Sequence, residues 1–120
     1  MSIPFVQAKN FKRGRSKGIR AVVIHDMESS EAVNSAESAA QMCASWNRET
    51  SWHYAVDVNS AVQSVREQDT AWHATGVNSD TIGIEHAGKA SQSRKDWLDN
   101  YSLVMLKEVS APLVADICKR

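Results

Sequence analysis

The chain has 120 residues, of which 42% are hydrophobic and 23% are charged, and its formal net charge is zero. This length and balance are those of one small globular domain, and they exclude a disordered chain or two independent cores. No apolar run approaches the roughly 18 residues that a bilayer-spanning helix needs, and the first 20 residues contain no secretory signal. We therefore expect neither membrane insertion nor export through a signal peptide.

Basic side chains are concentrated at the beginning of the chain. The first 20 residues carry six of the 14 basic side chains and none of the 14 acidic ones. We interpret residues 1–18 as a basic, solvated arm that packs loosely on the more acidic remainder. The alternative is contact with an anionic polymer, either nucleic acid or cell wall. Because only Phe5 and Phe11 supply aromatic rings there, we expect no nucleic-acid partner.

The first predicted elements are a strand and a helix. A β-branched run over 19–25 predicts a buried strand with His25 at its carboxyl end, where open α/β sheets place their ligands. Small apolar residues then recur at helical spacing and predict an amphipathic helix over 31–47. The candidate N-caps are three serines near its start, Ser29, Ser30 and Ser35.

The middle of the chain predicts a hairpin, a loop and another strand. Alternation over 52–66 predicts two strands joined by a turn at 59–60, and the polar stretch 67–79 predicts a loop. The next strand, 81–87, has two faces, with Ile82, Ile84 and His86 on one and Gly83, Glu85 and Ala87 on the other. Small residues flank Glu85, so its carboxylate has room for a ligand.

A helical pattern begins at Trp97 and continues to the end, with Pro112 inside it. This proline either kinks one long helix or lies in the first turn of a second helix that Ser110 caps. Cys43 and Cys118 lie among apolar helical positions, which favours buried free thiols over a disulfide. The order of elements predicts an α/β fold with a mixed β-sheet flanked by α-helices.

Chemically capable side chains lie at strand ends and in loops, but no spaced metal motif, nucleophile elbow or phosphate-binding glycine loop is present. The sequence therefore predicts a pocket that combines His and Glu side chains. We expect His53 and His86 to be structural residues held by hydrogen bonds or packing. Trp72 either anchors its loop or stacks on a sugar. The pocket candidates are His25, Glu28, His73 and Glu85.

Three segments together resemble a known family. They are AVVIHDMES (21–29), SWHYAVDVN (51–59) and AWHATGVNSDTIGIEHAG (71–88). In this order they resemble the zinc-dependent N-acetylmuramoyl-L-alanine amidases, which include the amidase-type phage lysozymes and the related peptidoglycan recognition proteins. The resemblance covers residues 6–118, and the opening of the chain is most similar to amidase domains of endolysins from phages of actinobacteria.

The resemblance implies roles for particular residues. His25 corresponds to a zinc ligand, Glu85 to the general base, and His73 to a residue that lines the substrate groove, with Trp72 and Glu28 as further substrate-binding candidates. Trp52 occupies a position that holds a Tyr in some members. Because an indole does not exchange protons as a phenol does, we expect no acid–base role for Trp52.

The family's remaining zinc ligands, a His followed by His, Asp or Cys, come from a segment after the last helix, and nothing in this sequence matches that segment. We therefore expect a single amidase domain over 1–120 that is truncated at its C-terminal end and holds one of three ligands. Such a chain binds Zn²⁺ weakly and hydrolyses little by itself. A complementary C-terminal fragment or self-association through an exposed sheet edge would then be its partner.

The resemblance implies a function for the domain. It would be the catalytic domain of a phage endolysin, cleaving the amide between N-acetylmuramic acid and L-Ala in bacterial peptidoglycan. Such a protein is made in the host cytoplasm, reaches the cell wall through a separate membrane pore and lyses the host. The alternative is a non-catalytic peptidoglycan-binding module with the same fold.

Overall fold

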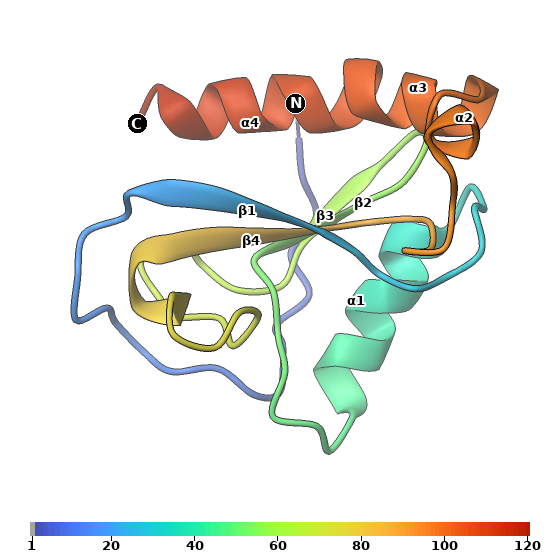
Figure 1. Ribbon diagram of the computed structural model, residues 1–120. Helices are drawn as coiled ribbons and strands as arrows, with labels where there is room; N and C mark the ends of the chain where they lie inside the picture. Colours follow the sequence, from blue (N-terminus) through green and yellow to red (C-terminus); the bar gives the residue numbers. More distant parts are fainter. Residues whose placement is uncertain (1) are drawn as a thin grey trace.

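The computed structural model describes residues 2–120, which form a four-stranded sheet with helices on both faces (Figure 1). The strands are β1 (Ala21–Asp26), β2 (Tyr54–Val56), β3 (Ala61–Gln63) and β4 (Thr81–His86), in the spatial order β1-β4-β2-β3. Strand β4 is parallel to β1 and β2, while β2 and β3 are antiparallel. The predicted mixed α/β fold is confirmed, as are the two long strands and the hairpin.

Helix α1 (Ser35–Ser45) covers one face of the sheet and begins four residues later than predicted. None of the three candidate serines caps it, because the N-cap position is Asn34, whose side chain makes no capping bond. The amide of Ala36 in its first turn instead donates to the buried carboxylate of Asp57, which is 21 residues away in the chain. A helix start that depends on a distant side chain leaves no local signal in the sequence.

The opposite face of the sheet is covered by the C-terminal helical region. It consists of α2 (Arg94–Trp97), α3 (Asn100–Val104), a π-helical stretch (Met105–Ser110) and α4 (Ala111–Cys118). Figure 1 shows the last three as nearly one continuous rod. The wider π turns lie immediately before Pro112, which has no N–H to donate, and this favours the one-helix alternative. Ser110 does not cap a second helix, because its hydroxyl contacts His86 Nε2 at 2.7 Å.

Two apolar clusters hold the layers together. Small residues of α1, including Ala36 and Ala40, lie against β2 and β3 with Trp52. On the other face, Ile82 and Ile84 are fully buried against the C-terminal helices. The predicted division of the side chains is confirmed within β4, so Glu85 points to the α1 side. It is wrong for Ala87, which follows the strand and packs in the same cluster as Ile82 and Ile84. Of the two cysteines Cys43 is buried, whereas Cys118 is exposed, which makes the prediction wrong for Cys118.

The N-terminal segment is tied to the sheet rather than loosely attached. Main-chain amides of Val6 and Ala8 donate to the carbonyls of Gln63 and Ser64, each at 2.8 Å, so this segment covers the outer edge of β3. The prediction of a loosely packed arm was therefore wrong. In the part of the chain that the structure describes, β1 forms the other edge of the sheet, and its Ile24 is 56% exposed. None of the helices in residues 2–120 is both long and apolar enough to cross a membrane.

Candidate functional site

A groove of about 530 Å³ lies between the carboxyl end of β1, helix α1 and the segment that enters β2. Its volume is in the range of small-molecule and peptide sites. Aromatic and aliphatic side chains form much of its wall, hydroxyl groups line one side, and acidic residues gather at the strand end. Its lining includes Asp26, Met27, Glu28, Ser35, Met42, Trp46, Arg48, Trp52 and Glu85.

Glu85 is the most strongly perturbed acid that borders the groove. Its side chain comes from the middle of the sheet and the residue is only 9% exposed. Burial, followed by the nearby charge of Asp26, raises the pKa of Glu85 to about 8. A carboxyl group with such a pKa both takes up and releases a proton near neutral pH, which is the property required of a general acid–base residue.

The raised pKa of Glu85 predicts a pH-dependent effect on stability. Its folded-state value of about 8 lies above the ordinary 4.5, so the folded state binds the proton more tightly and loses stability as the pH rises between these values. Glu85→Gln removes this charge. Relative to the wild type, the variant should therefore gain roughly 2–4 kcal/mol in free energy of unfolding between about pH 5 and about pH 9.

Urea denaturation of both proteins at several pH values measures this difference. Glu108→Gln is the matched control, because it makes the same chemical change at an exposed position on the C-terminal helices. A difference between Glu85→Gln and wild type that stays constant over the whole range would show that Glu85 is not buried as described.

His25 lies directly beside Glu85. The two residues are register partners on the parallel strands β1 and β4, so their side chains leave the same face of the sheet. Burial lowers the pKa of His25, and Asp26 opposes part of this effect. His25 Nε2 contacts His73 Nδ1 at 3.0 Å, with the two rings nearly perpendicular. The sequence prediction that Glu85 and His25 share one site is consistent with this placement.

His73 and Trp72 line a second, smaller pocket of about 360 Å³, which shares Thr50 with the groove. Burial, followed by the proximity of His25 and Arg15, lowers the pKa of His73 to about 4, so its ring is neutral at physiological pH. Both ring nitrogens of His73 already have partners, because Nε2 contacts the Thr81 hydroxyl at 3.0 Å. The substrate-binding role of His73 and Trp72 stays a prediction.

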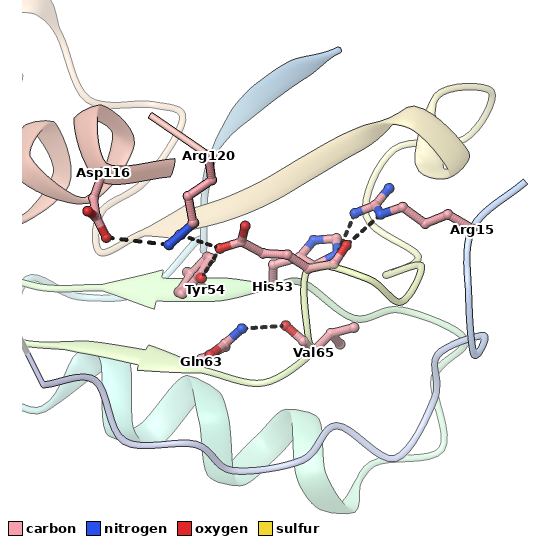
Figure 2. A network of polar contacts seen from close by, with 8 residues as sticks. Arg15, His53, Tyr54, Gln63, Val65, Asp116 and Arg120 are labelled. Atoms are coloured by element: carbon pink, nitrogen blue, oxygen red, sulfur yellow. Dashed lines mark hydrogen bonds and ion pairs between the residues drawn. The ribbon is translucent and has the colours of Figure 1, made fainter. Parts of the chain in front are cut away.

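His53 is a structural residue, as predicted. It is fully buried, and its Nδ1 accepts the Gly83 amide at 3.1 Å. The remaining proton on Nε2 then faces the carbonyl of Asp69 at 3.0 Å. Burial lowers the pKa of His53 to about 3. Arg15 reaches this ring from the N-terminal segment (Figure 2) and also donates to the carbonyl of Thr81.

A second polar network lies on the other side of the sheet and ties the C-terminal helix to the rest of the fold. Tyr54 donates to the Glu67 carboxylate, which also accepts from Arg120 at 2.6 Å. Figure 2 shows Arg120 between Tyr54 and Asp116. Arg120 Nη1 lies 3.5 Å from Asp116 Oδ2. None of these side chains borders the groove, so we assign this network to the packing of α4.

Three features of the groove were not predicted from the sequence. Asp26 borders the groove and raises the pKa of Glu85. Because Asp26 follows His25 directly in the sequence, its place in the site could have been predicted. Arg48 lies over the ring of Trp46, 5.3 Å from its centroid, and brings a cation to the wall. Trp52 is 4% exposed, and its indole N–H has no partner among residues 2–120. The absence of an acid–base role for Trp52 stays a prediction.

Glu28 lies in the groove, at the turn that leaves β1. Its backbone has a φ of 53°, in the left-handed region that non-glycine residues rarely adopt. One carboxylate oxygen accepts the amide of Ala90 at 2.5 Å, which links this turn to the loop after β4. A structural role for Glu28 is therefore shown, while contact with substrate stays a prediction.

No group of three His, Cys, Asp or Glu side chains within residues 2–120 is arranged to hold a metal ion. His25 and His73 approach each other closely, but they share a hydrogen bond, and the next histidine, His53, has its own partners. His86 lies on the opposite face with Ser110. Within the described residues, His25 is therefore the one proposed ligand, without a complete set around it.

Comparisons with known proteins place these features in a family. A family model described as N-acetylmuramoyl-L-alanine amidase matches residues 14–120. N-acetylmuramoyl-L-alanine amidase A of Achromobacter lyticus is 36% identical over 106 residues, which cover 83% of this chain and 51% of that protein. The chain thus spans about half the length of this curated relative.

Solved structures share the fold at lower sequence identity. A mutant of PlyL superposes with a TM-score of 0.74 at 16% identity, covering 99% of this chain and 74% of that one. A mutant endolysin from Bacillus subtilis has a TM-score of 0.64 at 22% identity, with coverage of 80% and 67%. These likenesses support the mixed α/β fold described above.

Proposed function

Because the chain belongs to the N-acetylmuramoyl-L-alanine amidase family, we propose that it hydrolyses the amide between N-acetylmuramic acid and the L-Ala of the stem peptide in bacterial peptidoglycan. The observation that carries this proposal is the placement of Glu85. A largely buried carboxylate with a pKa of about 8 borders a groove large enough for a glycopeptide, beside the register position of His25. Amide hydrolysis requires a group of this kind.

The proposed chemistry assigns the proton transfers to Glu85. In its ionised form Glu85 takes a proton from a water molecule whose oxygen attacks the lactyl carbonyl carbon. The bond from that carbon to the L-Ala nitrogen then breaks, and Glu85 passes the same proton to the departing amine. The products are a lactyl carboxylic acid and a free L-Ala amino group.

The walls of the groove provide the proposed substrate contacts. Glu28 and the α1 side of the groove would contact the stem peptide, while Trp72 and His73 would extend the site toward the second pocket. Trp52 contributes to the groove wall, while its indole N–H is buried.

The family resemblance also implies a zinc ion, for which His25 would be one ligand. Residues 2–120 do not fit the ion as a complete set, because catalytic zinc sites use three protein ligands and the described side chains do not cluster in that way. No step of the proposed chemistry is therefore assigned to the metal. We expect this chain to bind Zn²⁺ weakly and to hydrolyse its substrate slowly by itself.

The resemblance to phage endolysins supports a proposal for the biological setting. We propose that the protein is made in the cytoplasm of a bacterial host, reaches the wall through a separate membrane pore and contributes to host lysis. The endolysins among its structural neighbours support this setting. Its proposed partner is peptidoglycan. A complementary C-terminal segment or a second copy of the chain would be a further partner.

A muropeptide assay tests the proposed function. The chain is incubated with purified N-acetylmuramoyl-pentapeptide, with and without added Zn²⁺, while calorimetry measures binding and mass spectrometry follows the products. We expect binding together with slow release of the free peptide. Binding without release would support the peptidoglycan-binding alternative, and the absence of both would overturn the proposal.

A further inference from the structure

His73 connects His25 to the main chain through a short series of hydrogen bonds. The Thr81 hydroxyl donates its hydrogen to the carbonyl of Val77 at 2.7 Å, so toward His73 it acts as an acceptor. The ring proton of His73 therefore lies on Nε2, and Nδ1 carries the lone pair. Because His25 Nε2 lies 3.0 Å from that Nδ1, the proton between the two rings belongs to His25.

The backbone around His73 is built to hold the ring in this position. The amides of His73 and Ala74 both donate to the side-chain oxygen of Asn78, at 3.0 and 2.7 Å. The ring lies flat against Gly83 of β4, where a Cβ atom would come within 2.4 Å of it. The loop thus fixes the position of the ring as well as its hydrogen-bond direction.

We propose that His73 is a positioning residue for His25. By accepting the Nε2–H of His25, it holds that ring beside Glu85 and leaves the lone pair of His25 on Nδ1. Nδ1 is then the ring nitrogen of His25 that accepts a hydrogen bond. This inference deepens the proposed function, because it concerns the same site and rests on it.

Nitrogen NMR of the isotope-labelled chain at neutral pH reads the tautomer of each imidazole. We expect the ring proton on Nε2 in both His25 and His73 of the wild type. Thr81→Val keeps the shape of the side chain but removes the hydroxyl that fixes His73. In that variant we expect His25 to become a mixture of tautomers. Thr75→Val is the matched control, because Thr75 is exposed in the same loop, and it should behave as wild type.

A second pair of variants keeps the test decisive if Thr81→Val folds poorly. His73→Gln retains an oxygen that accepts from His25 and should preserve the Nε2 tautomer, whereas His73→Leu should release it. The signals of His53, which has its own partners in Gly83 and Asp69, report that the fold is intact.

Two results would overturn the inference. One is a proton on Nδ1 of His25 in the wild type, and the other is an unchanged His25 tautomer in both Thr81→Val and His73→Leu. Because the tautomer is read without substrate, failure of the muropeptide assay would not affect this outcome. Loss of hydrolysis with the tautomer preserved would refute the proposed function alone.

Discussion

Glu85→Gln should reduce the rate of muropeptide hydrolysis by about 10²–10⁴-fold, the usual contribution of a general acid–base residue. The amide of Gln has nearly the same shape but does not take a proton from water at neutral pH. Substrate binding should change by less than about threefold, because the groove walls remain. Product release over long incubations, compared with the wild type under identical conditions, measures the effect.

Glu108→Gln serves as the control for this experiment as well. Glu108 is exposed on the helical face of the sheet and away from the groove, so the same chemical change there should leave the rate unaltered. A Glu85→Gln chain that retains hydrolysis within about fivefold of wild type would exclude Glu85 as the proton-transfer residue.

Asp57→Ala should lower the free energy of unfolding by about 3–5 kcal/mol. Asp57 is fully buried, and its carboxylate accepts from Ala36 at the start of α1. It also accepts from the Asn59 amide and from both the amide and the hydroxyl of Ser60. Truncation leaves these donors without acceptors, and the turn after β2 loses its connection to the helix that forms a wall of the groove.

Asp57→Asn separates the two parts of this effect. The single side-chain oxygen of Asn can accept the hydrogen bonds of the turn, but its NH₂ group would face the Ala36 amide. We therefore expect the free energy of unfolding to fall by roughly 2 kcal/mol. Asp116→Ala is the control, since Asp116 is exposed on α4, and it should cost less than about 1 kcal/mol. Urea denaturation measures all three variants. A value for Asp57→Ala within 1 kcal/mol of wild type would contradict the capping role.

The parts of the fold that depend on local patterns could be predicted from the sequence. The β-branched runs predicted the boundaries of β1 and β4 to within two residues. The alternation over 52–66 predicted the hairpin. In β4 the alternation also placed the side chains of Glu85 and Ile84 on opposite faces of the strand. These elements were predictable because successive side chains of a strand alternate between its two faces, so the period shows which residues share a face.

The features that depend on distant residues were not predictable in this way. The first turn of α1 is held by Asp57, which no local residue indicates, so the predicted start at residue 31 was wrong. Arg15 belongs to a charged run that resembles a solvated arm, yet its guanidinium bonds to carbonyls near residues 67 and 81. Such contacts form only once the sheet brings those segments together.

The pairing of His25 with Glu85 was predicted, whereas the contacts around this pair were not. The sequence and the family resemblance placed His25 and Glu85 together, and the strand register brings them side by side. The sequence did not reveal that Asp26 affects the pKa of Glu85, or that the nitrogens of His73 are both engaged. Side-chain contacts between β1, β4 and the 72–81 loop can be identified only once the tertiary structure is known.

The most direct test of the account asks which bond of the muropeptide is cut and where the oxygen of water goes. The chain is incubated with substrate in water enriched in the heavy oxygen isotope, and the two products are analysed by mass spectrometry. If Glu85 delivers water to the lactyl carbonyl, the label appears in the lactyl carboxylate and the peptide begins with a free L-Ala amine. Label at a sugar carbon, or cleavage between two amino acids of the stem, would contradict it.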